Sequence, residues 1–281
     1  MFSGNLINKT VNNVFFPEIC SSCGEINEGL LCEKCRKDVI EIKKITCQFC
    51  GAPFITDKQK FPINYNNAVS FPNALSSNIQ NLKVDPGFSK IQIPKINVES
   101  CPSCRECGYE FLRLRSFGLY RGILKKIIIK FKYGRIYSLA PVLSSFLKNS
   151  FIENYINEKI DYMDTVPDFS AFRDGFNYAS RQPDNHMQIL AKMFSKETGI
   201  PYGSNIIKIK KTLRQQNLGV YERKVNLEGV FKAVNALEVF KKNILLIDDV
   251  WTTGNTLNEI SKALKNCGAQ KIYLLTIARA I

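Results

Sequence analysis

Apolar positions in the second half of the chain recur with two different periods. Between residues 122 and 133 they form one helical face, made up of Ile123, Leu124, Ile127, Ile128 and Phe131. This spacing predicts an amphipathic helix. The same pattern predicts helices at 137–149, 184–198 and 254–267, and strands at 161–166, 205–209, 243–248 and 271–278. Because strands alternate with helices, we expect an α/β fold with a mostly parallel sheet flanked by helices.

The first half of the chain is dominated by cysteine. Nine of the ten cysteines precede residue 108, and they fall into CxxC pairs. Two such turns supply the four thiolates that tetrahedral zinc accepts. The predicted ligands are Cys20, Cys23, Cys32 and Cys35 for one ion, and Cys47, Cys50, Cys104 and Cys107 for a second, with Cys101 left as a spare. A closed four-sulfur shell has no open position for a substrate, so we expect the zinc to be structural.

Disulfide bonds and a redox-active CxxC are the alternatives to zinc. Disulfides are uncommon in the cytosol. Zinc binding explains several CxxC pairs in succession more simply than redox chemistry does. Between the pairs, residues of about 52–100 are rich in Asn, Ser, Pro, Gln and Lys, a composition typical of an insertion or linker. We therefore expect a zinc-ribbon module over 1–115, with this low-complexity insertion, followed by the α/β domain over 116–281.

Composition and charge restrict the expected cellular location and the expected binding partners. The apolar runs are far shorter than the roughly 20 residues that span a bilayer, and residues 1–14 lack the pattern of a secretory signal. We therefore expect a cytoplasmic protein with no membrane span. The formal net charge of +14 favours polyanionic partners, although a general bias toward Lys, Asn and Ile would also produce it.

The segment from residue 243 to residue 257 carries the candidate chemistry. Its apolar strand ends in Asp248 and Asp249, and the carboxyl ends of parallel strands open onto the ligand crevice. Adjacent carboxylates repel each other, so they call for a partner such as sugar hydroxyls or a cation. The loop that follows offers hydroxyls, a glycine and the free amides of a helix start, from Thr252, Thr253, Gly254, Asn255 and Thr256. Together these groups suit a ribose 5-phosphate.

This segment resembles the phosphoribosyl-pyrophosphate signature of type I phosphoribosyltransferases. The rest of the chain, apart from the insertion, resembles the ComF family of competence-associated proteins. That resemblance rests on the cysteine pairs, the segments 131–134, 166–167, 173–177 and 222–226, and Gln216. It implies a type I phosphoribosyltransferase-like sheet behind a small N-terminal four-cysteine zinc-ribbon module.

The resemblance also implies residue roles. Asp248 and Asp249 would face the ribose hydroxyls as the catalytic pair, and residues 252–256 would hold the 5-phosphate. Arg173 would bind pyrophosphate together with magnesium, while Lys211 and Arg214 lie in what resembles the mobile loop that closes over the site. The sequence departs from the family at Asp174, where a basic residue is more usual, and an acid there would weaken the attraction for pyrophosphate.

Three functions fit these observations. The first is a ComF-type protein that binds phosphoribosyl pyrophosphate or a similar phosphate ligand and acts in DNA uptake, with single-stranded DNA and other competence proteins as partners. The second is an active phosphoribosyltransferase, a glycosyltransferase acting on pentosyl groups, in nucleotide or base metabolism. The third is a zinc-ribbon interaction protein with a vestigial site.

Further residues are candidates for a role in these functions. Candidate contacts for a phosphate backbone, with solvated helix faces as the alternative, are Arg113, Arg115, Arg121, Lys125, Lys126, Lys130, Lys132, Arg135, Lys208, Lys210, Lys211 and Arg214. His186 is expected to face solvent or cap a helix, and Trp251 to stack on a ligand or fill the crevice wall.

Overall fold

The computed structural model describes residues 18–42, 46–53, 101, 104, 108–167, 185–210, 227 and 229–280. The chain divides into two compact units, one formed by residues 1–42 with 110–281 and the other by residues 43–109. The first cysteine group therefore belongs to the same unit as the α/β domain. The domain boundary expected after residue 115 falls inside the first strand, β1 (Arg113–Leu119).

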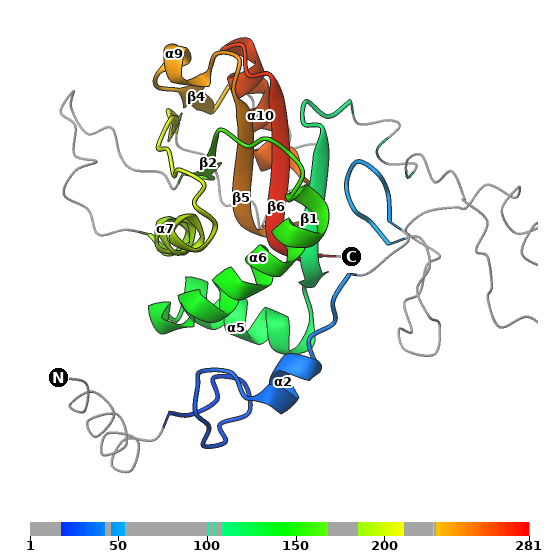
Figure 1. Ribbon diagram of the computed structural model, residues 1–281, viewed down its shortest axis with the longest axis vertical. Coiled ribbons are helices and arrows are strands. Elements are labelled where there is room, and N and C mark those ends of the chain that lie inside the picture. The colour runs from blue at the N-terminus through cyan, green and yellow to red at the C-terminus, as the bar shows by residue number, and fades with distance from the viewer. Residues whose placement is uncertain are drawn as a thin grey trace, which may run out of the picture. The chain divides into compact units, whose positions relative to one another are not determined.

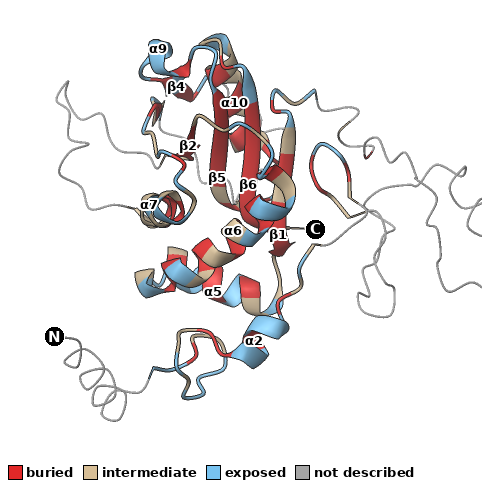
Figure 2. Ribbon diagram, in the orientation of Figure 1, coloured by how far each residue is buried: buried red, intermediate tan, exposed pale blue. Residues whose placement is uncertain are grey.

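The larger unit is built on a four-stranded parallel sheet. Its strands are β1, β6 (Lys271–Arg279), β5 (Asn243–Trp251) and β2 (Tyr162–Thr165), in that spatial order. Their side chains are mostly buried on both faces, as the red strands in Figure 2 show, which explains the continuous apolar runs of β5 and β6. Because the strands are parallel, their carboxyl ends meet at one edge, and the candidate ligand residues lie there.

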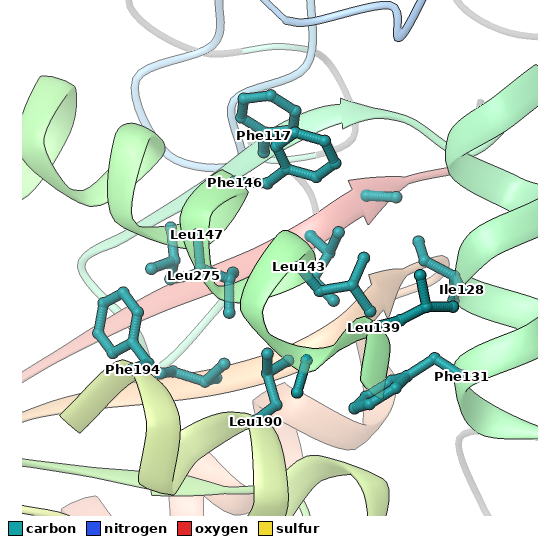
Figure 3. Close-up of a cluster of buried hydrophobic side chains, with 14 of the residues drawn as sticks. Phe117, Ile128, Phe131, Leu139, Leu143, Phe146, Leu147, Leu190, Phe194 and Leu275 are labelled. Atoms are coloured by element: carbon teal, nitrogen blue, oxygen red, sulfur yellow. The ribbon is translucent and has the colours of Figure 1, made fainter. Parts of the chain in front are cut away.

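Helices cover the two faces of this sheet. They are α5 (Gly122–Lys132), α6 (Ala140–Tyr155), α7 (His186–Thr198) and α10 (Asn255–Asn266), with a 3-10 turn, η2 (Tyr137–Leu139), before α6. Figure 1 shows α6 crossing the sheet on one side and α10 on the other. One buried cluster joins α5, α6 and α7 to that first side, and Figure 3 shows Phe131, Leu143 and Leu190 meeting over the strands. The fold class predicted from the sequence is confirmed.

Shorter elements complete the described structure. A two-stranded antiparallel sheet pairs β3 (Ile206–Lys208) with β4 (Phe231–Ala233), and two short helices are α9 (Ala236–Val239) and α2 (Glu33–Lys37). Each of the seven other helices and strands predicted for the second half overlaps an observed element, although α6 continues to Tyr155, beyond its predicted end at residue 149. β1 and β4 were not predicted from the apolar pattern. None of the described helices is long and apolar enough to cross a membrane.

The outer edge of β1 is covered by the segment that follows the first cysteine group. Ile42 donates its backbone N–H to Phe117 O at 2.9 Å, and Leu119 donates to Ile40 O, also at 2.9 Å. Gly118 permits this close approach, because a Cβ at that position would lie 2.7 Å from Ile40 O. Residues 40–42 therefore act as a short antiparallel partner for an edge that would otherwise be unpaired.

Candidate functional site

The two aspartates at the end of β5 have unequal surroundings. Asp249 is buried, whereas Asp248 is half-buried. Asp248 Oδ1 accepts a hydrogen bond from the backbone N–H of Asp249 at 2.8 Å. Only one of the two carboxylates is thus appreciably open to solvent.

Two side chains from other elements reach the buried carboxylate. Lys132, the last residue of α5, places Nζ 2.5 Å from Asp249 Oδ2, and His186, the first residue of α7, places Nε2 3.3 Å from the same oxygen. Burial alone would raise the pKa of Asp249, but the hydrogen bond with His186 and the charge of Lys132 outweigh it and hold the pKa below its usual range. Burial likewise opposes the charge of Lys132, yet the two aspartates raise its pKa.

The loop after β5 has a backbone shape that glycine alone tolerates well. Gly254 caps α10 with φ of 78°, in the left-handed region. A Cβ there would lie 2.0 Å from Cη2 of Trp251, whose ring is buried against it and makes an edge-to-face contact with Phe111 at 5.8 Å. Trp251 therefore packs in the wall beside the loop, which is one of the two roles expected from the sequence.

The predicted phosphate-binding residues lie at the start of α10. Thr252 is exposed, Thr253, Asn255 and Thr256 are half-buried, and Gly254 is buried. The first turn of a helix leaves backbone N–H groups without intrahelical partners, and its dipole favours an anion. Gly254 has no side chain that could cap these groups, which suits a helix start that meets an anion.

A further buried carboxylate stands at the end of the neighbouring strand β2. Asp164 Oδ1 accepts from the backbone N–H of Thr165 and Oδ2 from that of Asn205, both at 2.8 Å. Burial raises the pKa of Asp164 to about 7, although both hydrogen bonds act in the opposite direction. Asp164 fastens the end of β2 to the chain that leads into β3, so its role is to support the edge where the site lies.

The first cysteine group brings together Cys20, Cys23, Cys32 and Cys35, as predicted. The Sγ atoms of Cys23 and Cys32 lie 3.7 Å apart, far longer than the roughly 2.05 Å of a disulfide bond. Zinc–sulfur bonds of about 2.3 Å in a tetrahedron place the sulfurs roughly 3.8 Å apart. Backbone N–H groups of Cys32 and Cys35 point at the sulfurs of Cys20 and Cys32. These four residues fit a structural zinc ion.

The second group corrects one prediction. Its members are Cys47, Cys50, Cys101 and Cys104, with the sulfurs of Cys50 and Cys101 again 3.7 Å apart. Cys101 N donates to Cys47 Sγ at 3.3 Å. Cys101 is therefore a member of the site and not a spare, because the knuckle that completes the shell is 101–104. Cys107, predicted as the fourth ligand, lies outside the described residues.

Comparisons with known proteins identify both parts of the chain. Residues 11–65 match the model of the double zinc ribbon domain, and residues 199–280 match that of the phosphoribosyl transferase domain. Competence protein F of Haemophilus influenzae is 38% identical over 114 residues, which are 40% of this chain and 46% of that protein. Competence protein ComFC of Streptococcus pneumoniae is 24% identical over 66% of this chain and 83% of its own length. The chain is thus similar to ComF-type competence proteins, and it combines a double zinc ribbon match with a phosphoribosyl transferase match.

Another relative, DNA utilization protein YhgH of Salmonella typhimurium, is 25% identical over 64% of this chain and 78% of its own length. This chain spans less than half the length of the Haemophilus protein in their match. In this chain the zinc-ribbon match contains the first cysteine group, and the phosphoribosyl transferase match contains β5 and the loop before α10.

His186 is the main site residue that the sequence did not reveal. The expectation that it faces solvent or caps a helix is wrong, because only 11% of its side chain is exposed and it contacts Asp249. The cap is Asn185, whose side chain accepts from Gln188 N while the Gln188 side chain accepts from Asn185 N. The sequence predicts Lys132 only as a candidate phosphate contact, and no local pattern connects either residue with Asp249.

The basic residues singled out by the sequence differ in their surroundings. Arg113 pairs with Glu158 at 2.5 Å, Lys130 donates to Ser21 O, and Lys132 pairs with Asp249. Lys125 and Lys126 remain exposed on α5. Arg173, Lys211 and Arg214, predicted to bind pyrophosphate or close over the site, lie outside the described residues, as does Asp174.

Proposed function

We propose that this protein binds phosphoribosyl pyrophosphate, or a related ribose 5-phosphate, at the end of β5, and that it acts in the handling of DNA during natural transformation. The observation that carries the ligand is the juxtaposition of a half-buried carboxylate, Asp248, with the glycine-capped start of α10. A carboxylate accepts hydrogen bonds from sugar hydroxyls, and the helix start donates to a phosphate. Magnesium would accompany the pyrophosphate group, whose charge it neutralises.

Ligand-dependent stability tests the binding site. A ligand that binds only the folded state stabilises it by about 2.7 kcal/mol at a hundredfold excess over Kd. We expect phosphoribosyl pyrophosphate with magnesium to raise the unfolding temperature of the wild type, and the Asp248→Asn, Asp249→Asn double variant to lose that shift. Absence of a shift in the wild type would remove the proposed ligand.

The DNA part of the proposal is supported by the names of the relatives and by the net charge of +14. Exposed lysines such as Lys125 and Lys126 are available to phosphates. If they neutralise the backbone of single-stranded DNA, log affinity falls with log salt by about 0.7 per phosphate contacted. An affinity that does not change with salt would exclude this mode of binding.

An active phosphoribosyltransferase is the second candidate, favoured by the domain match over residues 199–280. Such an enzyme displaces pyrophosphate from the ribose through a positively charged, oxocarbenium-like state, and the site must exclude water from it. Release of pyrophosphate on addition of a candidate base distinguishes this activity from binding alone. Binding without pyrophosphate release across a panel of bases would favour the first function.

A further inference from the structure

A positively charged side chain lies beside the aspartate pair of β5, although the sequence around the pair does not indicate one. Two adjacent carboxylates in a partly buried place require a compensating cation. Among the described residues, Lys132 Nζ lies 2.5 Å from Asp249 Oδ2, and His186 Nε2 lies 3.3 Å from the same oxygen. The chain therefore brings a cation to the pair from a helix that ends 117 residues earlier in the sequence.

The contacts also separate the roles of the two aspartates. Only 5% of the Asp249 side chain is exposed, and its Oδ2 is shared by two partners from α5 and α7. Phe131, the neighbour of Lys132, packs edge-to-face against His186 at 5.9 Å, so these partners are held together by the core. Asp248, by contrast, is half-buried, and its Oδ1 accepts from the backbone N–H of Asp249. The buried carboxylate of Asp249 therefore serves to hold its partners, whereas the more exposed carboxylate of Asp248 can contact a ligand.

We propose that Lys132 is a positioning residue that supplies the cation of the carboxylate pair from within the chain, leaving Asp248 to accept from the hydroxyls of a ribose phosphate. The ligand part of this inference rests on the proposed function. It predicts a neutral diol as the partner of the pair, because the position beside Asp249 that a divalent cation would take is filled by the Lys132 ammonium. Lys132 stabilises Asp249 as the anion, and His186 limits its rotation.

The test compares two ligands that differ by the sugar. Inorganic phosphate probes the loop before α10 alone, and ribose 5-phosphate probes the loop and the carboxylate pair together. Lys132→Met should weaken the binding of ribose 5-phosphate by about tenfold to a hundredfold, which is the contribution of a hydrogen bond to a charged group. The affinity for inorganic phosphate should not change. Lys132→Arg should recover part of the loss. Lys196→Met, an exposed lysine on α7, is the matched control and should change neither affinity.

Equal weakening of both ligands would overturn the inference, since Lys132 would then act on the phosphate. Lys132→Met leaves a buried carboxylate unpaired, so Lys132→Met with Asp249→Asn serves as a second variant. The double variant should bind ribose 5-phosphate more tightly than Lys132→Met does. Weaker binding would contradict the inference that Asp249 serves to hold its partners.

A measurement without ligand separates this inference from the proposed function. Carboxyl-carbon NMR should show the pKa of Asp249 rising in Lys132→Met, and an unchanged titration would overturn the role given to Lys132. If the wild type binds neither ligand, the proposed function fails, and the titration still decides whether Lys132 is the cation of the pair.

Discussion

Gly254→Ala should be one of the most damaging small substitutions in the described structure. An alanine in the left-handed region costs about 1 kcal/mol, and a Cβ at 2.0 Å from the Trp251 ring adds overpacking of about 1–3 kcal/mol. We therefore expect the free energy of unfolding, measured in urea, to fall by about 2–4 kcal/mol. The affinity for phosphate should fall as well, because the start of α10 must shift to make room.

Gly199→Ala is the matched control for this substitution. Gly199 ends α7 with φ of 76°, nearly the value at Gly254, but a Cβ there would meet nothing within 4 Å. It should therefore lose only the backbone contribution of about 1 kcal/mol. The difference between the two variants measures the contact with Trp251. Equal losses would refute the reasoning that the ring closes the loop against any side chain.

Three further outcomes test other parts of the structure. Cys101→Ser should lower the zinc content from two ions per chain to one, whereas Cys267→Ser should leave it at two; the reverse would return Cys101 to the role of a spare. Because the folded pKa of Asp164 is raised to about 7, its contribution to stability should decline by up to about 4 kcal/mol as pH rises from about 4 to 7. Urea unfolding of Asp164→Asn should show a flatter dependence, and an unchanged slope would contradict the assignment. Asn185→Ala removes the cap of α7 and should cost about 1 kcal/mol of unfolding free energy, while no loss would mean that the cap is dispensable.

The site elements that are local in sequence could be predicted. The strand that carries Asp248, the loop after it and the helix beginning after Gly254 are set by an apolar run, a glycine and helical periodicity within about 25 residues, although β5 continues to Trp251, beyond its predicted end at residue 248. β1 escaped prediction because Arg113 and Arg115 interrupt its apolar pattern. Those two long side chains are accommodated at the strand's half-buried positions, and Arg113 stacks on the Tyr155 ring at 4.9 Å.

What could not be predicted depends on packing between distant segments. Lys132 and His186 meet Asp249 only because α5 and α7 end and begin at the same edge of the sheet. The cysteines show a different limit. Cys101, Cys104 and Cys107 offer two overlapping CxxC spacings that are equivalent in sequence, and only the fold selects the first.

The strip formed by residues 40–42 has a consequence for how the protein must be handled. It lies a few residues after Cys35, and Val39, which precedes it, packs in the same buried cluster as Cys32 and Cys35. An uncovered edge strand offers a row of backbone donors and acceptors to any other strand it meets. Chelators and oxidants that strip the first zinc would therefore release residues 117–119 of β1 as a template for self-association. Loss of metal in this protein would be visible as aggregation before the α/β domain itself unfolds.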